Sequence, residues 1–201
     1  MIISPVTLEG LHVKLIPMNI SHLDGLYEAL VGNNKWQDIW KYRVDKVKNK
    51  EDLKKYMEVA LAGVEKREII PFIIFDKSLD KVVGTTRFAD ICLEKKSLEI
   101  GWTSIAPEVM RTRVNTECKY LLLKHCFETL KLVRVALKTL SINERSQQAI
   151  LRIGAKKEGE LRWVARMANG EYINVVYFSI IQPEWPEVKR KLEGFLTAKQ
   201  K

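Results

Sequence analysis

The chain has 201 residues, of which 46% are hydrophobic and 29% charged, and its formal net charge is +9 at pH 7. This balance is typical of a globular protein, and no apolar run approaches the roughly 20 residues that a membrane span needs. The first residues carry neither a basic lead nor a small-residue cleavage site, so we expect a cytoplasmic protein. The positive charge suits a polyanionic ligand or an acidic partner. Nucleic acid is less favoured, because no recognisable nucleic-acid-binding motif is present.

The N-terminal third mixes regular and irregular segments. Residues 11–16 alternate well enough for an opening strand, and Ser21 is placed to cap an amphipathic helix that ends near Leu30. Residues 32–49 are polar, basic and aromatic, which indicates a loop with at most a short helix. Apolar side chains return at helical spacing over 51–62, which predicts a second helix.

The remaining two thirds read as strands and helices in a mixed order. Asn169–Gly170 between two strand patterns is a strong hairpin signal, and Gly154 is suited to end a helix. The expected strands are 69–75, 82–90, 98–105, 133–140, 156–167 and 172–181, and the expected helices are 116–130, 144–153 and one that begins near Pro183–Trp185. This order predicts an α+β fold, a mostly antiparallel mixed sheet flanked by helices.

Three cysteines, Cys92, Cys118 and Cys126, follow no zinc spacing, and the three histidines are scattered without a paired acid. We therefore expect no metal site. Cys118 and Cys126 fall in a leucine-rich helix, where free cysteine usually packs as a small hydrophobic residue.

Two expected helix starts lie near the carboxyl ends of neighbouring strands, in the turn at 110–115 and at 143–146. A helix N-terminus offers unpaired backbone N–H groups and the positive end of a dipole, which suits a phosphate. Arg111, Arg113 and Arg145 lie nearby in the sequence. Together these features predict an elongated anionic ligand that carries more than one phosphate.

The same region carries a family resemblance, in EIGW at 99–102, RVNTECKYLLLKHCFE at 113–128 and NERSQQAILRIGAKKEG at 143–159. These segments resemble the GCN5-related N-acetyltransferase (GNAT) family, in particular its ribosomal-protein-alanine N-acetyltransferases, the RimJ/RimL-like branch. The resemblance covers nearly the whole chain and weakens before about residue 70. It implies an acyl-CoA acyltransferase fold whose sheet is splayed between its fourth and fifth strands.

The resemblance also implies a single N-acetyltransferase domain over 1–201, with a variable acceptor-side part at 1–68, a core at 69–181 and a C-terminal helix at 182–201. Acetyl-CoA would be the acetyl donor. The acceptor would be a primary amine, either the N-terminal amine of a (ribosomal) protein or a small molecule. Apolar residues of the C-terminal helix would suit a homodimer.

The family's phosphate turn is altered in this chain. Its three characteristic positions fall on Met110, Arg113 and Asn115, and none keeps the family residue. Glycine in such a turn lets the backbone approach a pyrophosphate closely. Asn115 is either part of that site or only a helix N-cap. The expected cofactor contacts are Ser104, Ile105, Arg111, Thr112, Arg113, Val114, Asn115, Thr116, Asn143, Arg145 and Ser146.

Two residues are candidates for catalysis by resemblance. Glu99 would be the general base, or else a charged residue at a strand start paired with Lys95 or Arg87. Ser146 would protonate the departing thiolate, or else only satisfy backbone donors in the first turn of its helix. Many relatives use a tyrosine as the acid, and that position is Ile150 here.

Two further positions at which family members carry an acidic residue are occupied by Ala165 and Asn174 in this chain. These losses favour the alternative of a degenerate family member that binds acyl-CoA or a partner without turnover. The expected acceptor-binding residues are Trp36, Trp40, Arg87 and Asn174, and Trp36 and Trp40 could equally close the core. Three other tryptophans, Trp102, Trp163 and Trp185, lie in regular elements and are expected to be structural.

Overall fold

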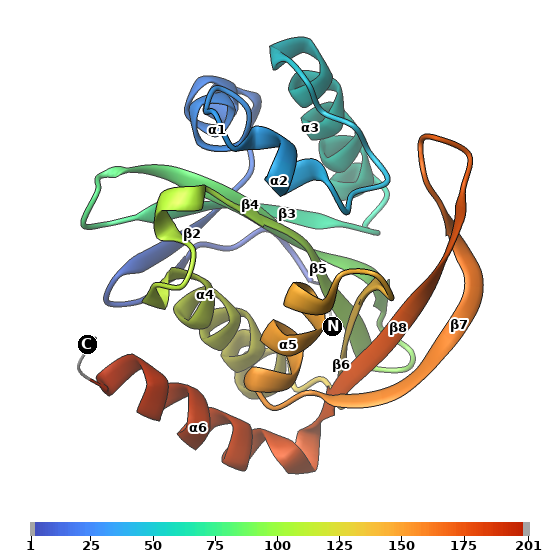
Figure 1. Ribbon diagram of the computed structural model, residues 1–201. Coiled ribbons are helices and arrows are strands. Elements are labelled where there is room, and N and C mark those ends of the chain that lie inside the picture. The colour runs from blue at the N-terminus through green and yellow to red at the C-terminus, as the bar shows by residue number, and fades with distance from the viewer. Residues whose placement is uncertain (1–2, 199–201) are drawn as a thin grey trace.

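The computed structural model describes residues 3–198, which form an eight-stranded sheet with helices on both faces (Figure 1). The strand order is β1-β2-β3-β4-β5-β6-β8-β7, and of the seven neighbouring pairs β5–β6 alone is parallel within these residues. The mostly antiparallel mixed sheet predicted from the sequence is therefore confirmed. The strands are β1 (Leu8–Glu9), β2 (Val13–Pro17), β3 (Ile70–Asp76), β4 (Lys81–Cys92), β5 (Ser97–Ile105), β6 (Arg134–Leu140), β7 (Lys156–Arg166) and β8 (Tyr172–Ile181).

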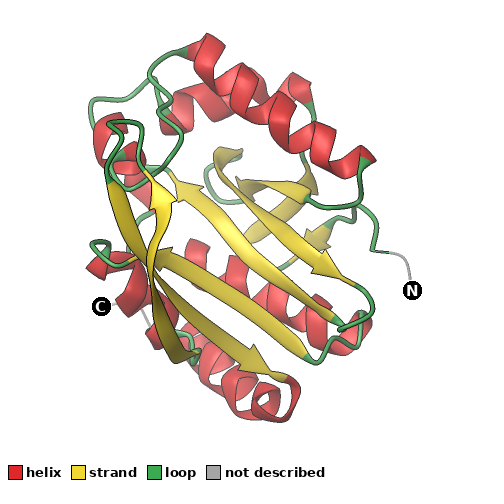
Figure 2. Ribbon diagram, turned by 90° about the vertical axis from the view of Figure 1, so that its right-hand side faces the viewer, coloured by secondary structure: helices red, strands yellow, loops and turns green. Residues whose placement is uncertain are grey.

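The helices divide between the two faces of the sheet (Figures 1 and 2). One face carries α1 (Leu23–Leu30), α2 (Trp36–Trp40) and α3 (Lys50–Glu65), and the other carries α4 (Arg113–Lys124), α5 (Glu144–Arg152) and α6 (Trp185–Thr197). A turn of π-helix, His125–Thr129, extends α4. No helix within residues 3–198 is long and apolar enough to cross a membrane.

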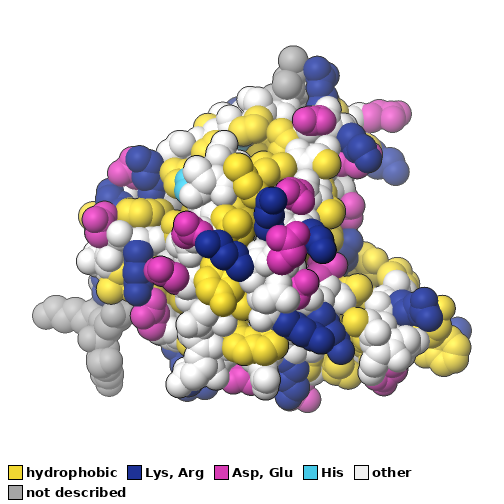
Figure 3. Space-filling view, turned by 90° about the horizontal axis from the view of Figure 1, so that it is seen from above, with side chains coloured by type: hydrophobic (Ala, Val, Ile, Leu, Met, Phe, Trp, Pro, Cys, Tyr) yellow, Lys and Arg dark blue, Asp and Glu magenta, His cyan; other side chains and the backbone are white. Residues whose placement is uncertain are grey.

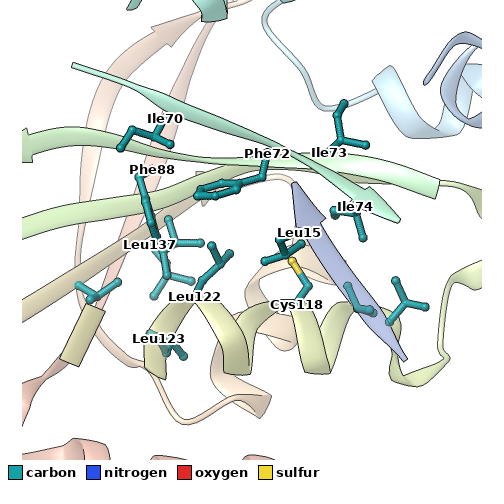
Figure 4. Close-up of a cluster of buried hydrophobic side chains, with 14 of the residues drawn as sticks. Leu15, Ile70, Phe72, Ile73, Ile74, Phe88, Cys118, Leu122, Leu123 and Leu137 are labelled. Carbon is teal, nitrogen blue, oxygen red and sulfur yellow. The ribbon is translucent and has the colours of Figure 1, made fainter. Parts of the chain in front are cut away.

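The hydrophobic core extends over both faces of the sheet, and Figure 4 shows the part that lies between the sheet and α4. Phe72 of β3 and Phe88 of β4 meet edge to face at 5.2 Å, and Leu15, Leu122 and Cys118 are likewise fully buried. Burying each large apolar side chain contributes roughly 1.5–3 kcal/mol. The expectation that Cys118 and Cys126 pack in the core is confirmed, and burial raises the pKa of the Cys118 thiol to about 11.

Glycines end two elements as expected. Gly154 follows α5 with φ of +100°, and Gly170, with φ of +89°, lies in the turn between β7 and β8. Side chains with a Cβ rarely adopt these conformations, which explains why the two signals identified a helix end and a hairpin correctly.

Two predicted helix starts were wrong in detail. Asn19, and not Ser21, caps the first helical turn, because its Oδ1 accepts a hydrogen bond from the N–H of Ser21 at 3.0 Å. The helix expected from 116 begins at Arg113, because Thr112 is its N-cap and accepts from the N–H of Val114 at 3.3 Å. Several polar residues in succession can each cap a helix, so the pattern located the helix but not its first residue.

A buried glutamate fixes α4 against the N-terminal segment. The carboxylate of Glu117 accepts hydrogen bonds from the N–H groups of Leu11, His12 and Val13 at 2.8, 2.8 and 2.7 Å. Gly10 lies so close that a Cβ there would be 2.6 Å from Oε1 of Glu117. These contacts hold the first turns of α4 next to the start of β2.

Candidate active site

The sheet opens between β5 and β6. The two strands pair over three residue pairs only, Ser97–Arg134, Leu98–Val135 and Glu99–Ala136. Beyond Glu99 this edge of β5 has no strand partner among the described residues, so its backbone groups are available to a ligand. The splay expected between the fourth and fifth strands is confirmed, and the short β1 makes these strands the fifth and sixth here.

A bulge interrupts the pairing of β5 with β4 in the same stretch. Thr85 pairs with Ser104 and Arg87 with Gly101, so Trp102 and Thr103 together lie opposite Thr86. Trp102 has φ of +50°, and such bulges commonly occur next to active sites.

The start of α4 lies within side-chain reach of α5. Nη1 of Arg145, in the first turn of α5, is 3.6 Å from Sδ of Met110 in the turn before α4. Nη2 of Arg152 donates to Oγ1 of Thr116 at 2.5 Å, which ties the two helices together. Asn143 caps α5 by accepting from the N–H of Ser146 at 3.1 Å. The guanidinium of Arg145 thus reaches the positive start of α4, which favours an anion there.

The guanidinium of Arg113 turns away from that region. Its Nη2 donates to the backbone oxygen of Ala198 at 2.6 Å, and its Nη1 lies 3.5 Å from Nε2 of His12. Only the backbone of Arg113 remains at the helix start. Arg111 has φ of +64° after Met110 at −65° and 141°, a turn geometry that favours glycine at the position of Arg111.

Two polar atoms near the opening lack partners. Oγ of Ser104 on β5 and Oδ1 of Asn115 in α4 are buried without a hydrogen bond from the described residues. Such atoms are normally satisfied by protein, water or a ligand. Asn115 lies within α4, so its role as the N-cap, which the sequence left open, is excluded.

Glu99 is 3% exposed and lies beside the splay. Its Oε2 is 2.6 Å from Nζ of Lys138 on β6, and the same Nζ is 3.0 Å from Oδ2 of Asp90. Its partner is therefore Lys138, and not Lys95 or Arg87 as the sequence alternative had it. Gly101 leaves room for the carboxylate, because a Cβ there would lie 2.6 Å from Oε1 of Glu99.

Burial raises the pKa of Glu99 from 4.5 to about 7, although the hydrogen bond and charge of Lys138 act in the opposite direction and Asp90 adds to the rise. A carboxyl group with this pKa is partly ionised at neutral pH and can accept a proton. Such perturbed groups cluster at functional sites.

Glu99 belongs to the face of the sheet that carries α1, α2 and α3. It pairs across the sheet with Ala89, and Gly101 pairs with Arg87, so the side chains of Arg87 and Glu99 point to one face. Arg87 reaches Tyr56 of α3, with 4.8 Å between its Cζ and the ring centroid. The base candidate therefore faces the N-terminal part of the chain, where an acceptor was expected.

Cations and aromatic rings alternate on this face. The guanidinium of Arg87 lies between Tyr56 and Trp102, with Cζ 4.8 and 5.1 Å from the two ring centroids. Nζ of Lys138 is 5.6 Å from the ring of Trp102, and Nη2 of Arg43 donates to the hydroxyl of Tyr56 at 3.0 Å. Tyr56, Lys138 and Arg43 were not expected from the sequence as site residues. The position of Trp102 in the segment that contains Glu99 was the one local signal.

Of the expected acceptor-binding residues, Arg87 is the one that the structure brings beside Glu99. Trp40 is 4% exposed, donates from Nε1 to the backbone oxygen of Leu30 at 3.0 Å, and meets Tyr56 edge to face at 5.4 Å. It thus supports Tyr56 from within the core. Trp36 packs against the same core and is partly buried.

Asn174 lies on the other face of β8. Its neighbours Ile173 and Val175 pack with Leu140 and Tyr42, so alternation directs Asn174 away from them. Its Oδ1 accepts from the N–H of Trp163 at 3.1 Å and its Nδ2 donates to Glu160 at 2.8 Å. The structure does not bring it together with Glu99. Trp163 is 72% exposed, so the expectation that it is structural was wrong.

Other ligand sites find little support. A surface hollow of about 270 Å³ lies between α5, β7 and α6, but none of the expected site residues lines it. In residues 3–198 no group of three His, Cys, Asp or Glu is placed to hold a metal ion. Lys and Arg are interspersed with Asp and Glu on the face that carries α1–α3 (Figure 3), so no continuous basic surface is visible there.

This fold and site define a class of protein. A family model described as "Acetyltransferase (GNAT) domain" matches residues 12–156, and the chain therefore belongs to the GNAT acetyltransferase family. Members of this family are N-acetyltransferases that use acyl-CoA. The family resemblance and the GNAT fold inferred from the sequence are confirmed.

Individual relatives agree with this assignment. The "Putative ribosomal N-acetyltransferase YdaF" of Bacillus subtilis (strain 168) is 30% identical over 113 residues, which are 56% of this chain and only 59% of the relative. A solved "putative acetyltransferase from T. thermophilus" has a TM-score of 0.85 and 30% identity, covering 96% of this chain and 98% of that chain. RimJ of Mycobacterium smegmatis, solved with CoA-disulfide, has a TM-score of 0.79 over 94% of both chains, and at 17% identity it supports the fold alone.

Proposed function

We propose that this protein transfers an acetyl group from acetyl-CoA to a primary amine, with Glu99 as the general base. The observation that carries the proposal is a buried carboxyl group with a pKa of about 7 beside the open, bulged edge of β5 in a GNAT fold. An amine must lose a proton to attack a thioester, and a base with a pKa near neutrality suits that task.

The residues present fit an acyl-CoA. The starts of α4 and α5 offer backbone N–H groups at Arg113 and Asn115 and at Arg145, and the guanidinium of Arg145 adds a charge for the phosphates. Groups of Ser104 and Ile105 on the unpaired edge of β5 suit the amide-rich arm, and the unpartnered Oγ of Ser104 and Oδ1 of Asn115 need partners there. When bound, the cofactor would supply an activated acyl group.

The side chains around Glu99 prepare it for its role. Lys138 hydrogen-bonds the carboxylate and holds it in one orientation, and burial keeps its pKa high enough to take up a proton. The hydroxyl of Ser146 forms no hydrogen bond within residues 3–198, so it is the candidate proton donor to the leaving sulfur. Asn143 places Ser146 by capping the helix on which it lies.

The acceptor is a primary amine of a small molecule or of a protein N-terminus. The name of YdaF, which refers to the ribosome, supports the N-terminus of a ribosomal protein as one candidate. The exposed aromatic pair of Trp163 and Tyr172 on the β7–β8 hairpin, with centroids 6.0 Å apart, offers additional surface to a protein acceptor.

Calorimetry with acetyl-CoA, followed by an acetyl-transfer assay with a panel of amines, tests the proposal. Arg145→Glu should weaken acetyl-CoA binding by about ten-fold or more, since it removes a charge-assisted contact and adds repulsion. Arg113→Glu is the matched control, because the guanidinium of Arg113 contacts Ala198 instead, and its effect should be smaller. Equal losses would contradict the phosphate site. Binding without transfer to any amine would support the non-catalytic alternative.

A further inference from the structure

Arg87 is a buried cation without a counter-charge. It lies in the middle of β4 and is 4% exposed. Its Nε and Nη2 are enclosed without a hydrogen bond, and none of the ion pairs formed by residues 3–198 includes it. A buried guanidinium in this condition is costly for a fold, since burial removes the water that would otherwise solvate it. An anionic ligand on the acceptor face would supply the missing counter-charge.

The surroundings of Arg87 restrict how that anion can bind. The guanidinium lies over the rings of Tyr56 and Trp102, with Cζ 4.8 and 5.1 Å from the two centroids. The free N–H groups therefore lie at the rim of the plane. Nε and Nη2 share one edge, and this edge forms two parallel hydrogen bonds with a planar carboxylate. In charge and geometry this edge therefore suits a planar carboxylate.

The guanidinium of Arg87 and the carboxyl group of Glu99 are close enough for one small acceptor to contact both. Arg87 pairs with Gly101 across the strands, and Glu99 is two residues from Gly101 on the same face. Diagonal neighbours of this kind have Cα atoms about 7–8 Å apart. An amine directed to Glu99 and a carboxylate on Arg87 can thus belong to one acceptor, provided that few bonds separate the two groups.

The geometry points to an acceptor that carries a carboxylate close to its primary amine, with Arg87 binding that carboxylate through Nε and Nη2. This inference rests on the proposed acetyl transfer at Glu99. Both a free amino acid and a peptide with an acidic side chain near its N-terminus supply this chemistry. Polyamines and aminoglycosides do not, because they bring only positive charge towards Arg43, Arg87 and Lys138.

Pairs of acceptors that differ in one carboxylate test the inference directly. The first pairs are free amino acids and their carboxamides, such as glutamate with its bis-amide and glycine with glycinamide. The second pairs are C-terminally amidated tripeptides whose first or second residue is Asp or Glu, compared with Asn or Gln. We expect kcat/KM to favour the acid over the amide by about ten-fold or more in one of the two sets, which identifies the source of the carboxylate.

The variants separate recognition from stability. Arg87→Gln should abolish the preference for the acid over the amide, measured as the ratio of their kcat/KM values in the same variant. Arg87→Lys, which keeps the charge but loses the fork, should reduce that ratio. Arg190→Gln removes the same charge from an exposed position on α6 and should leave the preference intact. If Arg87→Gln shows no cooperative thermal unfolding, the preference of Arg87→Lys for the acid is the deciding measurement. A preference that survives in the folded variant would overturn the inference.

Binding of products separates this inference from the proposed function. N-acetylglycine and N-acetylglycinamide are titrated into the CoA-loaded protein and followed by ligand-observed NMR. Tighter binding of the acid that depends on Arg87 would support the carboxylate site even if no amine is acetylated. Active transfer with equal rates for acids and amides, and equal product binding, would overturn the carboxylate site and leave the transferase intact.

Discussion

Replacement of Glu99 by Gln separates a catalytic base from a structural anchor, because the two roles predict opposite changes in stability. A carboxyl group whose pKa is higher in the folded protein than in the unfolded chain opposes folding when it ionises. Glu99 imposes no such cost below pH 4.5. The cost grows as the pH rises from 4.5 to about 7 and is complete above that, since burial raises the pKa of Glu99 to about 7.

The magnitude follows from the shift. A rise in pKa from 4.5 to about 7 corresponds to about 3 kcal/mol at roughly 1.4 kcal/mol per unit. Gln does not ionise, so the free energy of unfolding of Glu99→Gln relative to wild type should increase by up to about 3 kcal/mol between pH 4.5 and 8. For a chain of this size that is a relative gain of about 6–12 °C in Tm. The amide oxygen of Gln can still accept a hydrogen bond from Lys138, so any weakening of this contact shifts the stability of the variant by a constant amount and leaves the trend with pH.

Activity should change in the other direction. Loss of a general base typically lowers kcat/KM by about 10²–10⁴-fold. Ionisation of the acceptor amine affects both proteins equally, so the ratio of wild-type to variant kcat/KM isolates Glu99. That ratio should rise about ten-fold per pH unit up to pH 7 and then level.

Thermal unfolding and initial rates over pH 5–9 provide both measurements. A ratio that stays below ten-fold and does not vary with pH would refute the role of Glu99 as the base. A stability difference that is constant with pH would refute the raised pKa itself.

Three neighbouring substitutions give further tests. Lys138→Met removes the hydrogen bond and charge that lower the pKa of Glu99, so the rising limb of the pH–kcat/KM profile should move to higher pH. Asp90→Asn removes an influence that raises this pKa, so the limb should move to lower pH, and shifts in one common direction would contradict the assigned network. Gly101→Ala places a Cβ 2.6 Å from Oε1 of Glu99 and should lower kcat/KM by displacing the carboxylate. The affinity for acetyl-CoA should be unchanged and is the control. A fully active variant would show that this position of the carboxylate is not needed.

The order of elements could be read from the sequence because its signals are local. Asn169–Gly170 and Gly154 require particular backbone angles, and the apolar spacing of the helix that contains Leu122 reports its burial. The partner of Glu99 could not be read in this way. Lys138 is 39 positions further along the chain and reaches Glu99 only because β5 and β6 are neighbours in the sheet.

The direction of a long side chain was equally hidden. Arg113 was expected at the phosphates because of its place in the turn, but the backbone oxygen of Ala198 and the ring of His12 draw its guanidinium elsewhere. Asn115 was a reasonable N-cap by type, and Thr112 preceded it with the same chemistry. Arg87 was expected to bind the acceptor, and its unpartnered edge became visible only with Tyr56 and Trp102 in place.

The bonds from Glu117 to Leu11, His12 and Val13 join positions that are 104 to 106 residues apart. On the ribosome, at about 5–20 residues per second, the N-terminal segment would wait roughly 5–20 seconds before this glutamate is synthesised. During that time β2 has no contact with α4, which is not yet synthesised. Its pairing partner β3 is synthesised about midway through the delay. Closing such a long loop is slow, so the docking of the N-terminus should be a late event in folding. The N-terminal residues that support the proposed phosphate-binding helix are therefore the first to be synthesised but among the last to reach their native contacts.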